Sequence, residues 1–266
     1  MKITIFTSNR PRHNYLVNKI SEVCDELCVV QECGTYYPGI VPGVYPSSLV
    51  YEKYFKKVIE AERKIFNSCV VNLRKQNYTN LSIPFNDLNK FTLKNLEEFL
   101  NSDIYIIFGS SYLKGNLVDF LINKKAINIH MGISPYYRGS DCNFWALYDD
   151  NASLVGSTIH YLSKGLDNGP ILYHAVSEYN EDLFLYSMST VKSAIFSLAE
   201  RIKNEKIFHY KAIMQDRKKE VRYTKKKDFN EEVINQFFNK KIRENNMEIK
   251  NFLKDPYILL NKNFLN

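Results

Sequence analysis

The chain has 266 residues, of which 45% are hydrophobic and 24% are charged. This balance is typical of a soluble globular protein with one large domain, or one medium domain and an appendage, and it excludes a mostly disordered or collagen-like chain. No stretch approaches the roughly 18 consecutive apolar residues that a membrane-spanning helix needs. The N-terminal segment, residues 1–7, is interpreted as a first strand rather than a signal peptide.

Charge is concentrated in one segment. The 36 basic and 29 acidic side chains give a net charge of +7, and residues 217–227, with seven basic residues and one acid, contribute +6 of it. The remainder is nearly neutral, which argues against nucleic acid as a general partner. We interpret the basic segment as a solvated edge strand, with attraction to phosphate or a membrane surface as the alternative.

Five cysteines are scattered along a chain that is large enough to fold without disulfides, and they are Cys24, Cys28, Cys33, Cys69 and Cys142. We therefore expect reduced thiols and a cytoplasmic protein. Cys24 and Cys28 have a ligand-like spacing, but four apart on one helix and without a histidine pair they are more typical of packing, so no metal is expected. Glycine fingerprints for dinucleotides, a P-loop and a zinc-protease helix motif are missing from the sequence.

Short strand-like runs alternate with helical patterns through the first two hundred residues, which predicts βαβ units and a largely parallel sheet. A helix that buries Leu16, Ile20, Val23 and Leu27 should follow the first strand. The segment 36–46, with three prolines and two glycines, predicts irregular structure. Strands are expected at 3–6, 28–31, 69–73, 103–108, 126–130, 154–162 and 170–175, and further helices at 49–66, 92–100, 113–121 and 182–203.

The composition changes near residue 205, where Lys, Asn and Glu become frequent. We predict a catalytic domain over residues 1–205 and a C-terminal extension over 206–266. The extension should begin with the basic strand or hairpin and continue as a helix that starts near Asp228 and Glu231, a pair that resembles a capping box.

The most unusual polar residues lie at the end of the strand 126–130. Asn128 and His130 are two residues apart, so they project to the same face of a strand that is otherwise apolar. The carboxyl ends of strands in open α/β sheets are where ligands bind. A capping asparagine with a satisfied buried histidine is the structural alternative, but the pair before the Gly/Pro turn 131–135 favours a functional site.

Asp167 is the natural third member of this site. It lies in the turn 164–169, which could return over the same sheet edge. A carboxylate beside His130 would fix the imidazole tautomer and hold its pKa near neutrality, and Asn128 could donate to a developing oxyanion. Taken alone, the segment Asp167-Asn168-Gly169 is also an ordinary tight turn.

Three separated motifs together resemble a known family. They are residues 128–139 (Asn-Ile-His-Met-Gly-Ile-Ser-Pro-Tyr-Tyr-Arg-Gly), residues 156–160 and residues 167–170, and His130 precedes Asp167 by 37 residues. The pattern resembles the formyltransferases that use 10-formyltetrahydrofolate, and it is most like the sugar N-formyltransferases of surface-polysaccharide synthesis. The resemblance extends over roughly residues 1–205.

The resemblance implies an α/β fold: a Rossmann-like, mostly parallel twisted sheet flanked by helices, here with a short, mainly helical C-terminal extension. It implies a one-carbon transferase in which Asn128 and His130 stabilise the oxyanion while His130, held by Asp167, moves a proton from the acceptor amine. The co-substrate 10-formyltetrahydrofolate would lie against two loops, formed by Phe108, Gly109, Ser110, Ser111, Tyr112 and Leu113 and by Gly165 and Leu166. It implies no metal.

The acceptor is expected to be an amino sugar linked to a nucleotide, as in lipopolysaccharide and O-antigen synthesis. The glycinamide ribonucleotide enzymes have a Gly- and Ser-rich phosphate loop that this chain lacks, and the methionyl-tRNA enzymes have a C-terminal barrel for which the extension is too short. Basic residues are unfavourable at a helix N-terminus, so Arg10 and Arg12 favour a bound anion there. The residues expected around the acceptor are Ser8, Asn9, Arg10, Arg12, Tyr136, Tyr137 and Arg138.

Three alternatives stay open at this point: an enzyme acting on glycinamide ribonucleotide, one acting on methionyl-tRNA, and a non-catalytic relative that only binds ligands. The expected partners are small molecules, without nucleic acid or membrane, and a homodimer is one candidate assembly.

Overall fold

The computed structural model describes residues 1–67, 69–72, 77–240 and 258–259. Its centre is one twisted sheet in the order β10-β8-β7-β5-β4-β1-β2-β3. The strands are β1 (Lys2–Ser8), β2 (Glu26–Cys33), β3 (Tyr78–Pro84), β4 (Ile104–Phe108), β5 (Ile127–His130), β7 (Ser157–Tyr161), β8 (Ile171–Ala175) and β10 (Ile258–Leu259). The strands from β3 to β5 are parallel to one another, whereas β7 runs antiparallel to both β5 and β8.

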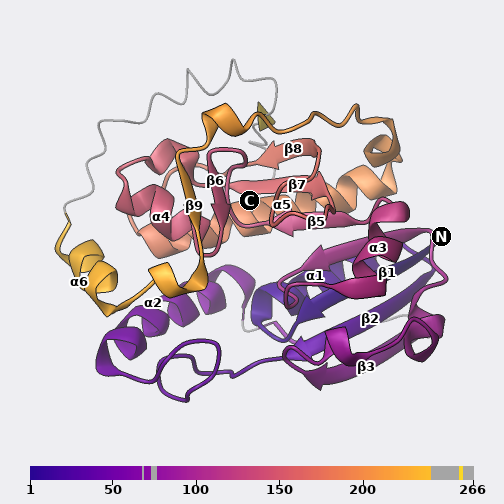
Figure 1. Cartoon of the computed structure of the whole chain (residues 1–266), viewed down its shortest axis with the longest axis horizontal. Helices are drawn as coiled ribbons and strands as arrows, with labels where there is room; N and C mark the ends of the chain where they lie inside the picture. The colour runs from indigo at the N-terminus through magenta and orange to yellow at the C-terminus, as the bar shows by residue number, and fades with distance from the viewer. Residues whose placement is uncertain (68, 73–76, 241–257, 260–266) are drawn as a thin grey trace.

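Helices lie on both faces of this sheet (Figure 1). The α-helices are α1 (Pro11–Ser21), α2 (Leu49–Phe66), α3 (Gly115–Asn123), α4 (Cys142–Tyr148), α5 (Leu183–Lys203) and α6 (Glu231–Asn239). Short 3₁₀ turns are η1 (Leu88–Lys90), η2 (Lys94–Phe99), η3 (Ala152–Leu154), η4 (Lys206–His209), η5 (Arg217–Lys219) and η6 (Lys226–Asp228). A second, two-stranded sheet joins β6 (Tyr137–Gly139) to β9 (Arg222–Thr224).

The alternation of side chains along each central strand divides the core into two layers. Ile104, Ile106 and Phe108 of β4 pack with α1 and α5 on one face. Tyr105 and Ile107 of the same strand pack with α3 and the η1–η2 segment on the other face. Both faces are apolar, as the parallel part of a covered sheet requires, so the polar residues at the strand ends are exceptional.

Most of the predicted elements are confirmed, with a few errors. Val23 and Leu27 were expected on the first helix, but α1 ends at Ser21, Val23 lies beyond it and Leu27 lies in β2. The last helix, α6, starts at Glu231 as expected, but its N-cap is Asn230 and not Asp228. The strand expected at 69–73 is wrong: residues 69–72 form neither helix nor strand, Leu73 is outside the described residues, and the third strand is β3. β3 pairs only with β2 and carries polar residues on much of its length, so it lacks the apolar signal of a buried strand.

The C-terminal segment crosses the surface to α6 and later contributes β10, and 241–257 and 260–266 of the predicted extension lie outside the described residues. β9 pairs in parallel with β6 and does not form a hairpin. Gly139 permits this close approach, because its φ is +98° and an added Cβ would lie 1.9 Å from the Thr224 carbonyl oxygen. In Figure 1 the β6–β9 pair stands between α4 and the strands β5, β7 and β8.

In the part of the chain that the structure describes, no helix is both long and apolar enough to cross a membrane.

Candidate active site

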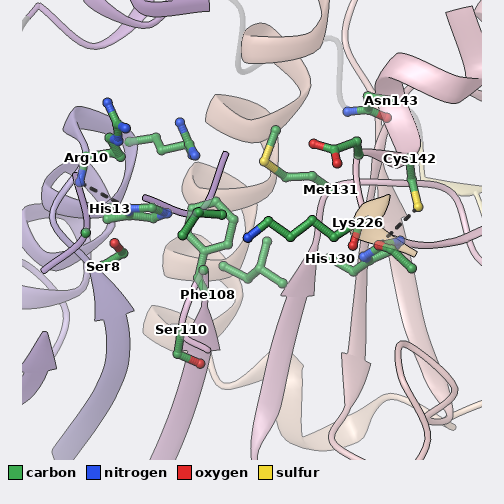
Figure 2. A pocket seen from close by; sticks show the side chains of 18 of the residues that line it. Ser8, Arg10, His13, Phe108, Ser110, His130, Met131, Cys142, Asn143 and Lys226 are labelled. Carbon is green, nitrogen blue, oxygen red and sulfur yellow. Dashed lines mark hydrogen bonds between the residues drawn. The ribbon is translucent and has the colours of Figure 1, made fainter. Parts of the chain in front are cut away.

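A cavity of about 910 Å³ opens at the carboxyl ends of β1, β4 and β5, where ligands bind in open α/β sheets. The loops that follow β1 and β4 line one side, and the end of β5 with the loop 165–167 lines the other. Figure 2 shows this division: Ser8, Arg10 and His13 lie on one side, His130 and Cys142 on the other, and Phe108 between them. The cavity thus joins the regions that the sequence predicts for folate and for the acceptor.

The three predicted catalytic residues meet in this cavity. Nδ1 of His130 lies 3.3 Å from Oδ1 of Asp167, and Nδ2 of Asn128 lies 3.5 Å from the same oxygen. The other carboxylate oxygen of Asp167 accepts a bond from the Gly139 amide at 3.3 Å. β5 supplies two members of this group, and a loop 37 residues after His130 supplies the third.

Burial and charge set the protonation of the His130–Asp167 pair. Burial lowers the pKa of His130 below its ordinary value, although the Asp167 carboxylate acts in the opposite direction. Burial alone would raise the pKa of Asp167, but the His130 and His160 imidazoles and the Gly139 amide outweigh it, so that pKa lies below its ordinary value. At neutral pH the pair is therefore an ionised carboxylate beside a neutral imidazole, an arrangement suited to accepting a proton.

Protonated His130 would find two acceptors in place. Its Nδ1 faces Asp167, and its Nε2 lies 3.3 Å from the Tyr137 carbonyl oxygen. A neutral imidazole has one N–H and can donate to only one of them, whereas the imidazolium can donate to both. Burial thus disfavours protonation of His130, whereas the two hydrogen-bond acceptors stabilise the imidazolium once it forms.

His160 is a fourth member of the site, to which the sequence analysis gave no role. It lies opposite Asn128 in the β5–β7 register. Its Nδ1 is 2.8 Å from the Tyr161 carbonyl oxygen and must donate there, so Nε2 is the acceptor for the Asn128 amide at 3.0 Å. This bond orients Asn128, and it occupies one of the two amide protons. The sequence offered one signal for this role: His160 is a second histidine close to the end of a predicted strand.

The loop predicted to hold folate, Phe108 to Leu113, lines the cavity along its whole length together with Gly165 and Leu166. Glu32, fully buried at the end of β2, fixes the loop: its carboxylate accepts from the Ser111 amide at 2.5 Å and the Ser111 hydroxyl at 2.9 Å. Tyr112 ties the loop to the Lys164 carbonyl oxygen through its hydroxyl, at 2.9 Å. The apolar side chains of Phe108 and Leu113 in this wall fit the face of a flat heterocycle.

The four predicted acceptor residues after β1 also line the cavity, but their polar groups are already engaged. Ser8 donates to the Glu32 carbonyl oxygen, and Asn9 is hydrogen-bonded to the backbone of Gly34. The Arg10 guanidinium donates to the carbonyl oxygens of Thr35 and Tyr36. Arg12 forms an ion pair of 2.8 Å with the buried Glu62. Among the described residues Arg10 thus has no carboxylate at ion-pair distance, whereas the charge of Arg12 is compensated by Glu62.

Three other predicted acceptor residues do not line the cavity. The ring of Tyr137 is fully buried in the core, and its hydroxyl lies 3.2 Å from an Asp149 carboxylate oxygen, so it has no face for a ligand. Arg138 is also buried and bonds to Glu220 and to the Leu166 carbonyl oxygen. Tyr136 precedes these residues and contributes its carbonyl to the Val221 and Arg222 amides. The prediction that Tyr137 and Arg138 contact the substrate is wrong. Successive side chains on β6 point to opposite faces, and both of these side chains are buried in the protein.

Besides Glu62, two charged residues that were not predicted from the sequence line the cavity: Asp141 and Lys226. Oδ1 of Asp141 accepts from the Tyr45 hydroxyl at 3.0 Å, while its buried Oδ2 has no hydrogen-bond partner among the described residues. Burial raises the pKa of Asp141 to about 6. Lys226 lies 5.2 Å from the centre of the Tyr45 ring and, within the described ranges, has no carboxylate at ion-pair distance.

Among the described residues, no group of three or more His, Cys, Asp or Glu side chains converges as a metal site.

Fold and site together define an open-sheet α/β protein with a polar Asn/His/Asp cluster at a strand end, a class suited to acyl-type transfer. Residues 89–191 match the family model described as formyl transferase. This stretch contains Asn128, His130 and Asp167. It ends before the segment that carries β9 and Lys226.

Curated relatives are similar over a shorter region. Formyltetrahydrofolate deformylase 2, a mitochondrial protein of Arabidopsis thaliana, is 30% identical over 100 residues, which are 35% of this chain and 28% of that protein. The match therefore spans under a third of the relative's length.

Solved structures share the fold at low identity. An N-formyltransferase from Helicobacter canadensis, solved with folinic acid and dTDP-3-aminofucose, aligns with a TM-score of 0.52 and 15% identity over 89% of this chain and 79% of that one. Phosphoribosylglycinamide formyltransferase from Anaplasma phagocytophilum aligns with a TM-score of 0.50 and 14% identity over 76% of this chain and 85% of that one. At these identities the likeness establishes the fold.

Proposed function

We propose that this protein transfers the formyl group of 10-formyltetrahydrofolate to the amine of a nucleotide-linked amino sugar, in surface-polysaccharide synthesis. The observation that carries the proposal is the meeting of Asn128, His130 and Asp167 in one cavity, within a stretch that matches the formyl transferase family. Apolar residues would stabilise a covered strand end better than this polar cluster does, so the cluster is expected to have a functional role.

The site residues divide the chemistry between them. Formyl transfer forms a bond between the acceptor nitrogen and the formyl carbon, and breaks the bond from that carbon to N10 of the folate. Neutral His130 takes the proton that the acceptor nitrogen loses, and delivers it to N10 as that bond breaks. Asp167 and the Tyr137 carbonyl stabilise the imidazolium in between. Asn128 donates one N–H to His160 at 3.0 Å and the other to Asp167 at 3.5 Å, and the longer of these bonds is the one it would exchange for the negative charge that develops on the formyl oxygen.

Folate is supported as the donor by the shape of the cavity beside β4. Phe108, Gly109 and Leu113 present an apolar wall with main-chain groups, and Glu32 holds the loop rigid. The Helicobacter canadensis neighbour was solved with folinic acid, a folate, in its crystal. These residues would bind and orient the donor, while the chemical step belongs to the cluster at β5.

An amino sugar carrying a nucleotide is supported as the acceptor by the size of the cavity and by the positive charge that lines it. The volume of about 910 Å³ is near the upper end of the range for small-molecule sites, which leaves room for two substrates. Arg10 and Lys226 present positive charge there without a carboxylate partner among the described residues, as a diphosphate would require. The Helicobacter canadensis neighbour contains dTDP-3-aminofucose.

A second candidate is hydrolysis of formyltetrahydrofolate, with water in place of the amine. It is favoured by the deformylase from Arabidopsis thaliana, 30% identical over 100 residues. The same His130–Asp167 pair could accept a proton from water. Enzymes acting on glycinamide ribonucleotide share the fold, but here the loop after β1 has no run of glycines to surround a phosphate.

The test is an assay of the purified full chain with 10-formyltetrahydrofolate and a panel of acceptors. The panel holds several nucleotide-linked amino sugars, a free amino sugar, glycinamide ribonucleotide and no amine. We expect tetrahydrofolate and an N-formyl sugar nucleotide to appear in equal amounts. Formate without any amine would establish the deformylase instead, and efficient formylation of the free sugar would contradict recognition of a nucleotide.

A further inference from the structure

The loop that carries Asp167 is held from outside the family match. We name residues 210–229 the C-terminal strap. It pairs with the start of β8 through two backbone bonds of 2.8 Å between Ile171 and Ile213, then crosses to β6 and pairs with it as β9. Between these two anchors it passes over the loop 165–169.

Gln215 of the strap bonds directly to the backbone on either side of the catalytic loop. Its Nε2 donates to the carbonyl oxygen of Asp167 at 2.9 Å and to that of Gly169 at 2.8 Å. Asp167 has a φ of +47°, a left-handed conformation that a residue with a side chain rarely adopts. Such a conformation persists only where its surroundings fix it, and both bonds act on that part of the backbone.

A second contact comes from Glu220 through Arg138. One guanidinium nitrogen of Arg138 lies 2.6 Å from a Glu220 carboxylate oxygen, and another donates to the Leu166 carbonyl oxygen at 3.0 Å. Arg138 is buried, so its charge needs this carboxylate. The residue before Asp167 is therefore tied to the strap through an ion pair.

The strap also positions the other support of Asp167. The Gly139 amide donates to Asp167 Oδ2, and Gly139 is the last residue of β6. β9 holds that end of β6, since Thr224 donates to the Ser140 carbonyl oxygen at 2.6 Å and accepts from the Ser140 amide at 3.1 Å. Both segments that meet at the Asp167 carboxylate are thus fixed by one stretch of chain.

From these contacts we infer that the C-terminal strap is a positioning element of the active site, in which Gln215 and the Glu220–Arg138 pair hold the Asp167 carboxylate against His130. This inference rests on the proposed function for its kinetic readout. It assigns a role to the basic segment 217–227, which the composition alone predicts to be a solvated edge strand.

The main experiment is a double-mutant cycle on the full chain. Gln215→Met keeps the length of the side chain and removes the donor. We expect it to lower kcat by 10- to 30-fold in the wild-type background, and by less than 2-fold when Asp167→Ala is already present, because residues that act through one another are not additive. Gln236→Met on α6, whose side chain does not line the cavity, is the matched control and should keep full kcat.

A substrate-free readout separates this inference from the proposed function. The His130 pKa is measured by NMR titration. Asp167→Ala removes the larger of the two groups that oppose burial and leaves the Tyr137 carbonyl, so it should lower that pKa further. Gln215→Met should lower it in the same direction, and Gln236→Met should leave it unchanged. If Gln215→Met titrates as the wild type, or lowers kcat equally in both backgrounds, the inference is wrong. If the wild-type protein transfers no formyl group, the titration still tests whether the C-terminal strap positions Asp167.

Glu220→Gln provides a second variant in case Gln215→Met does not fold. It keeps the shape of a partly exposed side chain and removes its charge. We expect a kcat 3- to 10-fold below wild type and a lower melting temperature, because Arg138 keeps its buried charge without a carboxylate. Full kcat in this variant would contradict the role of the ion pair.

Discussion

At the scale of single residues, catalysis should depend on the three side chains that meet at the end of β5. We expect His130→Ala, Asn128→Ala and Asp167→Ala each to lower kcat by 100-fold or more, which is about 3 kcal/mol of transition-state stabilisation. Asn80→Ala, on the exposed face of β3, is a control that should keep its activity. Steady-state kinetics with circular dichroism separates lost chemistry from lost fold, and near-full turnover of Asp167→Ala would refute the assignment.

The pH dependence should report the same histidine. Burial lowers the pKa of His130 below its ordinary value, so the neutral imidazole that accepts a proton is present at neutral pH. We expect kcat/KM to be constant near pH 7 and to fall as the pH drops through a pKa below 6.5, the ordinary histidine value. An acid limb centred above pH 7 would show that another group is the base.

Asp141 should make the protein less stable above pH 6 than below it. Its folded pKa, raised to about 6, lies above the unfolded value, so folding favours the protonated acid. The resulting penalty is absent below the unfolded pKa and complete above the folded one, where it reaches roughly 3 kcal/mol. Asp141→Asn should therefore raise the free energy of unfolding by about 1–3 kcal/mol at pH 8 and by almost nothing at pH 4.

Urea unfolding at the two pH values measures this difference. Asp119→Asn, an exposed carboxylate paired with Lys164, serves as the control and should not stabilise the protein at pH 8. A gain in Asp141→Asn of the same size at both pH values would show that burial of the charge is not the cause. A buried acid kept at such a cost beside a cavity is typical of functional sites.

At the scale of elements, the anion of the acceptor should be held by Lys226 of η6 together with the loop after β1. Arg12 is paired with the buried Glu62, whereas Arg10 and Lys226 have no carboxylate at ion-pair distance among the described residues. In Figure 2 the Lys226 side chain extends from the His130 side of the cavity toward Phe108. Lys226→Ala and Arg10→Ala should each raise KM for a nucleotide-linked amino sugar 10-fold or more, and KM for the folate less than 3-fold.

Lys225→Ala is the matched control, because this neighbour carries the same charge and does not line the cavity. Equal increases in both KM values, or an equal effect of Lys225→Ala, would refute a specific anion contact. Measuring at 50 and 200 mM salt adds a check, since a charge contact with phosphate weakens as ionic strength rises.

The elements also show what could be predicted from sequence. The strands β1, β2, β4 and β5 and the long helices have strong local patterns, so they were predictable. Motif and spacing also indicated that Asn128, His130 and Asp167 would lie close together, while their catalytic roles stay predictions. β3 was missed because an edge strand has no need of apolar residues. His160 and Asp141 were missed because their roles depend on contacts across the sheet and with Tyr45, 32 and 96 residues away in the chain.

The predicted substrate contacts of Tyr137 and Arg138 were wrong for a related reason. A motif places the two residues near the site, but the direction of each side chain follows from the pairing of β6 with β9, 85 residues further on (137 to 222). Pairing of that kind leaves no local mark in sequence. The error therefore concerns orientation, not location.

At the scale of the whole molecule, the C-terminal segment is joined to the rest of the fold through an aromatic cluster. Phe229, 2% exposed, has ring centres of Phe144 at 4.8 Å and Tyr54 at 5.1 Å, and the Tyr51 hydroxyl donates to its carbonyl oxygen. These partners belong to α2 and α4, so one side chain ties the end of the strap to two helices.

Phe229→Ala should therefore lower the free energy of unfolding by about 3–5 kcal/mol, because it removes a buried ring and leaves a cavity among packed neighbours. Trp145, 3% exposed in the same cluster and the chain's single tryptophan, makes fluorescence during urea unfolding a local reporter. Phe208→Ala, at a ring that is 56% exposed, is the control and should cost less than about 0.5 kcal/mol.

Fluorescence and circular dichroism should give one coincident transition, since the cluster and the sheet unfold together. A loss below about 1 kcal/mol, or a fluorescence transition that precedes the loss of secondary structure, would show that the C-terminal segment folds as a separate unit.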